Sequence, residues 1–362
     1  MKDRALRIFS KLAEPVDAIL FVNEEDPMSD ASFFYATGAT SGLFEHCPVV
    51  LYPDGRVRII TSRLEETSAR TTPAEVLPYS SPEERDDLLR ESLKGVRRLG
   101  INGHGISYHW CRQVESTVPG IELVDVKKAV TEARMIKDGK EIEALREACR
   151  IASRVAEEIP DLLRIGMPEY EAGAEIAYRM QRMGASSVSF DTIAAFGPSS
   201  AEPHYEPGAR QLAVGDPALF DFGCKFRRYC SDITRTFFAG RVDERFERIY
   251  SVVLESQRRA IAEVRPGVEG RAVDAAARSY IDSTEFRGAL IHSTGHSLGL
   301  NVHDGGRLAA NVDIVLEEGM VFTVEPGVYV PGVGGVRIED DVLVTRNGCE
   351  LLTSANKELR VI

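Results

Sequence analysis

The order of apolar and polar residues in the first third of the chain is typical of a small α/β domain. Residues 18–22 form a continuous apolar run of strand length, and residues 48–61 contain two further strand-like runs. The tripeptide Pro53-Asp54-Gly55 separates those two runs and has tight-turn chemistry, which predicts a β-hairpin. Residues 83–99 are charged and amphipathic, as in a surface helix. Strand and helix signals at this spacing predict an α/β domain over residues 1–128.

A long helix opens a second domain, which we expect over residues 129–362. Asp138 is suited to cap this helix and Glu141 to reach back to the same helix end. The next apolar residues recur at helical spacing: Ile142, Leu145, Cys149, Ala152, Val155 and Ile159. Further on, Gly166 and Gly267 each follow a long amphipathic helix and precede a shorter one, 101 residues apart (267 − 166). Two related halves around a common sheet would explain this spacing, and chance similarity is an equal alternative.

Composition and charge narrow the classes of protein. The chain has 362 residues, with 56 Asp plus Glu against 44 Lys plus Arg, so its formal net charge is −12. A hydrophobic content of 43% is too high for a disordered chain. The acidic excess argues against a general nucleic-acid binder, which needs a basic surface. No apolar run approaches the ~18 residues of a membrane span, and the charged N-terminus lacks a signal-peptide pattern. We therefore expect a cytoplasmic protein.

The cysteines predict free thiols. Six of them are scattered along the chain without a CxxC pair, which is not a disulfide framework at this length. Cys224 and Cys230 could face each other across a hairpin, but buried reduced thiols are the favoured interpretation.

Two pairs of acidic residues stand in segments that otherwise have the pattern of buried strands. Asp221 lies in the apolar run 218–223, and Asp232 follows it by 11 residues (232 − 221) at the start of another strand. If these strands pair as a hairpin, both carboxylates project from the same face. Near the C-terminus, Glu325 ends a strand, and Glu339 follows 14 residues later (339 − 325) after a glycine-rich turn.

Four converging carboxylates predict a metal site, because an unpaired buried carboxylate costs several kcal/mol. Two divalent ions supply a charge of +4 against the −4 of these acids. The imidazole of His296, which lies between the two pairs in sequence, completes a set of oxygen and nitrogen ligands. Such a set suits Mn, Co, Fe or Zn better than Ca or Mg. The alternative, that the acids are exposed or pair with Arg235 and Arg337, is disfavoured for five residues together.

The motifs around these residues identify a resemblance. They read SDITRT, TGHSLGLNVH, VEPGVY and GVRIEDD, and over about residues 130–350 the chain resembles the pita-bread metallopeptidases, in their prolidase and aminopeptidase P branch. The first domain resembles, more loosely, the creatinase-like N-terminal domain of that family. The resemblance implies an α/β (α+β) fold, with a curved and mainly antiparallel C-terminal sheet covered by helices.

The resemblance also implies roles for the five ligands. Asp221 would bind one metal, His296 and Glu325 the other, and Asp232 and Glu339 would bridge the two. A water between two cations loses a proton near neutral pH, and the resulting bridging hydroxide would attack the carbonyl of an Xaa-Pro bond. Glu325 would carry the proton to the leaving nitrogen.

Six further residues around the ligands are candidates for the site, and three of them, His204, His303 and Arg307, match family positions. His204 and His303 match histidines that act near the scissile carbonyl, and His292 stands four residues before His296, on a shared helix face or in a nearby loop. Arg307 matches an arginine that binds the free carboxylate of a dipeptide, which a guanidinium suits. Thr234 and Arg337 would orient the ligands from behind. For each lone residue, a purely structural role is the alternative.

Some features bear on specificity and assembly. The family usually has glycine where Ser297 stands, so a hydroxyl next to His296 would narrow the pocket. The family often has glutamate where Asp304 stands, and often proline after it. Here Gly305 and Gly306 follow Asp304, and these glycines would make this wall of the pocket more mobile. Family members are commonly homodimers, and residues 33–35 (Phe-Phe-Tyr) are a candidate contact with the partner chain.

These observations favour a metallo-exopeptidase of small proline-containing peptides, an Xaa-Pro dipeptidase rather than an Xaa-Pro aminopeptidase. A non-peptide C–N hydrolase on the same fold is a second hypothesis, disfavoured because all five ligands are present. A non-catalytic binding module is a third, and such modules typically lose ligands.

Overall fold

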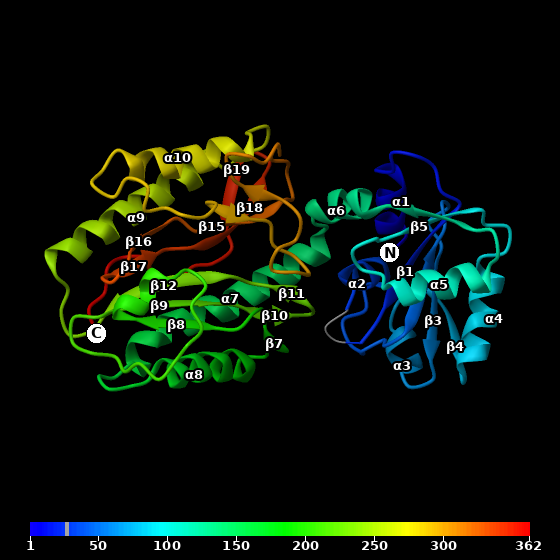
Figure 1. The fold of residues 1–362 in the computed structure, drawn as a ribbon, viewed down its shortest axis with the longest axis horizontal. Helices are drawn as coiled ribbons and strands as arrows, with labels where there is room; N and C mark the ends of the chain where they lie inside the picture. The colour runs from blue at the N-terminus through cyan, green and yellow to red at the C-terminus, as the bar shows by residue number, and fades with distance from the viewer. Residues whose placement is uncertain (26–28) are drawn as a thin grey trace. The chain divides into compact units, whose positions relative to one another are not determined.

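The computed structural model describes residues 1–25 and 29–362, and these form two compact units, Met1–Arg134 and Met135–Ile362 (Figure 1). Helix α6 (Lys127–Met135) spans both the boundary expected at residue 128 and the division between the units. The domain limits of 1–128 and 129–362 therefore stay a prediction.

The first unit is built on one six-stranded sheet in the order β4-β3-β2-β1-β5-β6. Strands β1, β2 and β3 are joined antiparallel, whereas β4, β5 and β6 each pair in parallel with their neighbour. The strands are β1 (Ala18–Asn23), β2 (Cys47–Leu51), β3 (Val57–Ser62), β4 (Glu75–Tyr79), β5 (Arg98–Ile101) and β6 (Glu122–Asp125). The hairpin expected at residues 53–55 is confirmed, with Gly55 at φ +85 in its turn.

The remaining elements of the first unit are helices, and one differs from expectation. They are α1 (Lys2–Ser10), α2 (Ala31–Thr37), α3 (Glu66–Ala69), α4 (Pro82–Ser92) and α5 (Tyr108–Thr117). The helix expected over 83–99 ends at Ser92, because Gly95 turns the chain at φ +82 and residues from Arg98 onward belong to β5.

The predicted partner contact at residues 33–35 is wrong. Phe33 and Tyr35 are fully buried in the first unit and Phe34 is 5% exposed, so these side chains belong to its core. They lie on helix α2, where Phe33 and Phe34 both pack against the ring of Phe44. An apolar run cannot by itself distinguish a core helix from a contact surface.

In the second unit, strands lie between two pairs of helices (Figure 1). Helices α7 (Gly139–Leu162) and α8 (Glu169–Arg182) share one apolar core with the first strands. Helices α9 (Glu244–Glu263) and α10 (Gly270–Asp282) share two further cores with the later strands. All named strand pairs in this unit are antiparallel.

The strands of the second unit form small sheets in the orders β12-β9-β8, β15-β18-β19, β11-β10-β7, β16-β17 and β13-β14. Their bounds are β7 (Ser187–Val188), β8 (Ile193–Phe196), β9 (Pro217–Phe222), β10 (Cys224–Phe226), β11 (Tyr229–Cys230), β12 (Ile233–Phe238), β13 (Gly295–His296), β14 (Arg307–Leu308), β15 (Val321–Val324), β16 (Gly327–Val330), β17 (Gly334–Arg337), β18 (Asp340–Thr345) and β19 (Gly348–Leu351), and a 3-10 helix, η1, covers Gly197–Ala201. The backbone N–H of Glu339, which directly precedes β18, donates to the carbonyl of Thr234 on β12 at 3.2 Å and so links two of the three-stranded sheets.

Helix α7 begins with the predicted capping box. The Asp138 carboxylate accepts from the N–H groups of Lys140 and Glu141 at 3.0 Å, and the Glu141 carboxylate accepts from the N–H of Asp138 at 2.9 Å. These bonds satisfy donors that a helix start otherwise leaves free. All six cysteines are free thiols, as expected.

The two glycines with similar sequence surroundings also have similar structures. Gly166 and Gly267 have φ of +86 and +83. Their N–H groups donate at 2.8 Å to the carbonyls of Leu212 and Leu316 respectively. Each loop joins a long helix to a shorter one, α7 to α8 and α9 to α10. The structural match favours two related halves over chance similarity.

Candidate metal centre

The first pair of acids comes from two paired strands. Strands β9 and β12 are antiparallel, with Asp221 opposite Thr234. Asp232 lies two residues before Thr234, so strand alternation places Asp221 and Asp232 on the same face. Both line one cavity of about 1000 Å³ in the second unit.

The second pair meets at the ends of two other strands. β15 pairs antiparallel with β18, and the last paired residues are Val324 and Asp340. Glu325 and Glu339 are the next residues outward, and both line the same cavity. The hairpin of β16 and β17 occupies the chain between them, so the glycine-rich segment is a strand pair of its own rather than a simple turn.

His296 reaches the cavity because its backbone packs closely on the next strand. The N–H of His296 donates to Thr323 Oγ1 at 3.1 Å. A Cβ at the preceding Gly295 would lie 1.9 Å from the carbonyl oxygen of Thr323, so only glycine permits this approach. The glycine of the TGH motif is thus required because a larger residue would collide with the neighbouring strand.

Ligand atoms of four of the five side chains lie close together, and Asp221 lines the same cavity. His296 Nε2 lies 3.5 Å from Asp232 Oδ2 and 3.6 Å from Glu325 Oε1. Ligand atoms of Asp232, His296 and Glu339 all lie within 4.8 Å of one another. Among the described residues, Asp221 Oδ1 and Asp232 Oδ1 are buried without a hydrogen-bond partner. Buried acceptors without donors fit a cation, so the residues present suit a divalent-metal site.

The charge state of the metal-free site agrees with this interpretation. Burial, followed by the neighbouring carboxylates, raises the pKa of Asp232 and Glu339 well above the usual values. Burial also raises the pKa of Glu325. Burial lowers the pKa of His296, which keeps the imidazole neutral and able to act as a ligand. The carboxylates of the site thus lack compensating positive charge, which a bound cation would supply.

Arg337 and Thr234 form hydrogen bonds to two of the proposed ligands, Asp221 and Glu339. Arg337 Nη2 donates to Asp221 Oδ2 at 2.6 Å, and Arg337 Nε donates to Thr234 Oγ1 at 3.0 Å. Thr234 Oγ1 in turn donates to Glu339 Oε2 at 2.6 Å. The expected alternative, an ion pair with Arg337, is therefore present for Asp221. It occupies one carboxylate oxygen of Asp221 and leaves Oδ1 without a hydrogen-bond partner among the described residues.

The other predicted residues line the same cavity. His204, His292, His303 and Arg307 are all among its walls. The ring of His303 lies edge-on to that of His296, with centroids 4.3 Å apart, and its pKa is lowered to about 4 by desolvation and then by His296. His292 precedes β13 in a loop, which leaves only the loop alternative for its spacing from His296.

Ser297 does not narrow the cavity as expected. Its hydroxyl accepts from the N–H of Gly306 at 3.0 Å, and the residue is fully buried outside the cavity walls. Asp304 is buried too, with one carboxylate oxygen 3.6 Å from Lys137 Nζ. These two departures from the family pattern therefore shape the loop behind the site.

Sequence reasoning missed two residues that hold His292 in place. The hydroxyl of Tyr329 lies 2.8 Å from His292 Nε2 and accepts from Arg337 Nη1 at 2.8 Å. Arg278 on α10 donates to the carbonyl of His292 at 2.8 Å and pairs with Asp274 at 3.1 Å. The VEPGVY motif contains Tyr329 and could have indicated it, whereas Arg278 lies in no motif.

Comparisons with known proteins agree with this geometry. The model of metallopeptidase family M24 matches residues 143–346, and the creatinase/prolidase N-terminal domain matches residues 9–136. The chain is similar to an Xaa-Pro dipeptidase of Pyrococcus furiosus, with 38% identity over 75% of this chain and 78% of that protein. It is also similar to the structure of an X-Pro aminopeptidase from Thermotoga maritima MSB8, with TM-score 0.92, 32% identity and coverage of 99% and 100%. An Xaa-Pro dipeptidase from Bacillus anthracis has TM-score 0.91, 34% identity and coverage of 100% and 99%.

The fold is therefore the pita-bread architecture preceded by a creatinase-like domain, and its relatives are Xaa-Pro exopeptidases of a metallopeptidase family. No helix in the described part of the chain combines the length and apolar character needed to cross a membrane. With this family match over more than half of its length, and with its ligand residues around one cavity, the chain belongs to metallopeptidase family M24.

Proposed function

We propose that the protein is an Xaa-Pro dipeptidase that uses two divalent ions. The observation that carries the proposal is the set of Asp221, Asp232, His296, Glu325 and Glu339 around one cavity, with two buried carboxylate oxygens that lack donors among the described residues. Asp221, Asp232, His296, Glu325 and Glu339 would hold the two ions, which when bound would activate a water as nucleophile and polarise the scissile carbonyl. Manganese is our first choice among Mn, Co, Fe and Zn, all of which suit these ligands.

The residues of the chain move the proton and orient the peptide. Glu325 Oε2 lies 4.0 Å from His292 Nδ1, and this carboxylate is placed to pass a proton to the leaving proline nitrogen. His303, with its pKa lowered to about 4, is neutral at pH 7 and can donate a hydrogen bond to the developing oxyanion. His204 faces the same space and shares this task.

Arg307 supports the dipeptidase alternative. It lies on β14 directly opposite His296 and lines the cavity, so its guanidinium can pair with the free carboxylate of a bound dipeptide. An Xaa-Pro aminopeptidase remains the second candidate, because the X-Pro aminopeptidase from Thermotoga maritima has nearly the same fold. A homodimer and a cytoplasmic location belong to the same proposal.

A substrate comparison tests the function. After loading with Mn²⁺ or Co²⁺, the full-length protein should cleave Xaa-Pro dipeptides faster than matched Xaa-Pro-Yaa tripeptides. Equal or faster cleavage of the tripeptides would contradict the dipeptidase proposal and favour the aminopeptidase. Hydrolysis confined to non-peptide C–N bonds would favour the second class of hydrolase. Well under one metal ion per chain, with no hydrolysis, would favour a binding module.

A further inference from the structure

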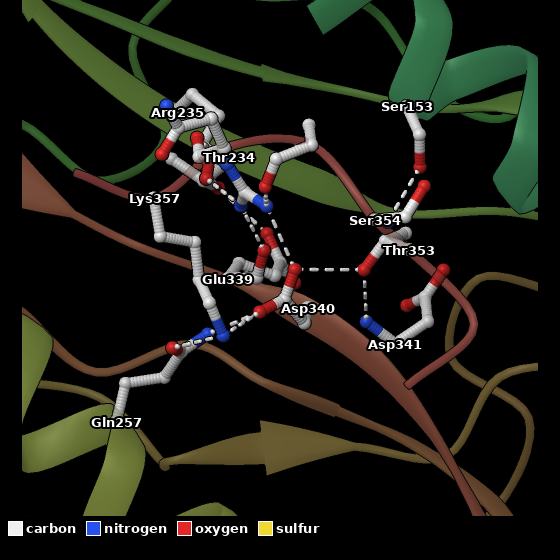
Figure 2. Close-up of polar contacts among 12 residues, drawn as sticks. Ser153, Thr234, Arg235, Gln257, Glu339, Asp340, Asp341, Thr353, Ser354 and Lys357 are labelled. Carbon is white, nitrogen blue, oxygen red and sulfur yellow. Dashed lines mark hydrogen bonds and ion pairs between the residues drawn. The ribbon is translucent and has the colours of Figure 1, made fainter. Parts of the chain in front are cut away.

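A largely buried ionic cluster lies next to Glu339, one of the two proposed bridging ligands (Figure 2). Its charged members are Arg235, Asp340 and Lys357. Arg235 follows Thr234 and Asp340 follows Glu339 in sequence. Arg235 thus stands three residues after Asp232, and Asp340 is the residue after Glu339, although no member of the cluster lines the cavity.

Arg235 fixes the distance between the two ligand-bearing segments. Its Nη2 donates to Asp340 Oδ1 at 2.8 Å. Its Nη1 donates to the carbonyl of Thr234 at 2.9 Å and also to the carbonyl of Glu339. One planar guanidinium thus bonds the backbone of both segments, and its rigid geometry leaves little freedom for them to separate.

Asp340 is held by donors on every side. Its Oδ2 accepts from Lys357 Nζ at 2.7 Å and from Gln257 Nε2 at 2.9 Å, while Oδ1 accepts from Thr353 Oγ1 at 2.8 Å in addition to Arg235. A buried carboxylate with complete partners is a rigid anchor, whereas one with a missing partner is costly.

The donors Thr353 and Lys357 come from the C-terminal segment of residues 353–357, which we call the strap. Arg235 donates to two strap carbonyls, Ala355 at 2.7 Å and Asn356 at 3.1 Å. Thr353 Oγ1 also accepts from the N–H of Asp341 at 3.1 Å.

Through Asp341 the strap is connected to the other bridging ligand. Asp341 Oδ2 accepts from the N–H of Asp232 at 2.9 Å and from Cys149 Sγ at 3.2 Å. Figure 2 shows Asp341 and Asp340 on either side of Thr353. Contacts of the strap therefore reach the backbone of Asp232 on one side and of Glu339 on the other.

We propose that the strap positions the metal ligands, with Lys357 as a positioning residue that acts through Asp340. The four acidic side chains crowd one cavity, and the cluster opposes the separation of the segments that carry them. Ligands that are already in place bind a cation more tightly, because less reorganisation accompanies binding. This inference rests on the metal centre of the proposed function.

The test measures metal binding directly, with Mn²⁺ or Co²⁺ alone as the probe. Lys357→Met removes the charge and keeps most of the aliphatic stem, at a side chain that is 21% exposed. We expect Mn²⁺ affinity to fall by about 10- to 100-fold, as for other groups that orient metal ligands. The visible absorption of bound Co²⁺ should change, because ligand geometry changes. Lys357→Arg, which keeps the cation, should restore most of the affinity.

Two further variants keep the test decisive. Glu358→Gln is the matched control, because the neighbouring Glu358 side chain forms an exposed ion pair with Arg258 at 3.0 Å. The affinity of this variant for Mn²⁺ should equal that of the parent. Thr353→Val removes the strap hydroxyl at nearly constant shape, and it should also weaken Mn²⁺ binding. If Lys357→Met does not fold, the Mn²⁺ affinity of Thr353→Val tests the proposal instead.

The outcomes separate this inference from the function it rests on. Weaker Mn²⁺ binding in Lys357→Met, recovery in Lys357→Arg and no change in Glu358→Gln would support the positioning role. Unchanged Mn²⁺ affinity and an unchanged Co²⁺ spectrum, with only a lower melting temperature, would overturn it, because the cluster would then serve stability alone. If the parent protein binds no divalent metal, the proposed function fails with it.

Discussion

Glu339 shows how much one side chain at this site depends on its neighbours. Its carboxylate accepts from Thr234 Oγ1, its N–H donates to the carbonyl of Thr234, and its own carbonyl accepts from Arg235. The N–H, the carbonyl and one carboxylate oxygen of the residue are thus all bonded to residues of strand β12. The residue also carries one of the negative charges that make a bound cation favourable.

Replacing this residue tests the role of a bridging ligand. We expect Glu339→Ala to lower kcat/KM on an Xaa-Pro dipeptide by about 10³-fold or more, because metal-assisted catalysis contributes several kcal/mol. Steady-state kinetics at saturating Mn²⁺ measure this effect. The exposed Glu318→Ala is the matched control and should retain parental activity. Near-normal activity in Glu339→Ala would refute the bridging role.

Arg307 makes a second prediction at the scale of the residue. If its guanidinium binds the carboxylate of the dipeptide, Arg307→Met should lose one charge-assisted contact, worth about 1.5–3 kcal/mol. We therefore expect kcat/KM for Xaa-Pro to fall by roughly 10- to 100-fold. The matched Xaa-Pro amide, which lacks the carboxylate charge, should lose much less in the same kinetic assay. Equal losses for acid and amide would argue against this contact.

At the scale of the element, helix α7 links a local sequence signal to the site. Its capping box is readable in the residues Asp138 and Glu141, and its buried face carries Cys149, which contacts Asp341. The helix interior is defined by spacing, whereas the helix ends at Leu162 because Leu163 is in an extended conformation. Helix starts with side-chain caps were therefore easier to predict than the end of α4, where a glycine turn decided the boundary.

The cap of α7 should make a measurable contribution to the free energy of unfolding. Asp138→Ala removes the acceptor for two backbone N–H groups, and such a loss costs about 1 kcal/mol. Urea denaturation followed by circular dichroism should show this decrease in the free energy of unfolding. Asp161→Ala, at an exposed position near the other end of the same helix, is the control and should change little. An unchanged midpoint for Asp138→Ala would contradict the capping role.

At the scale of the whole molecule, the stabilisation that bound metal gives to the folded protein should depend on pH. In the metal-free protein, burial raises the pKa of Asp232 and Glu339 well above the usual values, so both carboxyls hold protons more tightly when folded. Their stabilising contribution is present below their unfolded pKa of about 4 and is lost as pH rises through the raised folded pKa. Bound metal replaces these protons, and its stabilising effect therefore grows as pH rises.

The expected result is a widening difference in melting temperature. The difference between protein with excess Mn²⁺ and protein with chelator should increase from roughly pH 5 to pH 8. At a metal concentration of about 100 times Kd, binding adds about 2.7 kcal/mol of stability. Differential scanning calorimetry at several pH values measures both forms under matched conditions. A difference that narrows toward high pH would contradict the presence of a carboxylate metal site.

The sequence alone predicted the five candidate metal ligands and the family resemblance from specific motifs, and it predicted the capping box and the hairpin at residues 53–55 from residues close together in the chain. Only the tertiary structure decided that residues 33–35 are core, that Ser297 turns away from the cavity, and that Tyr329 and Arg278 hold His292. It also decided that Asn356 contacts Arg235, 121 positions away. Periodicity and motifs report which side chains favour burial or metal, whereas contacts between distant segments depend on how several elements pack together.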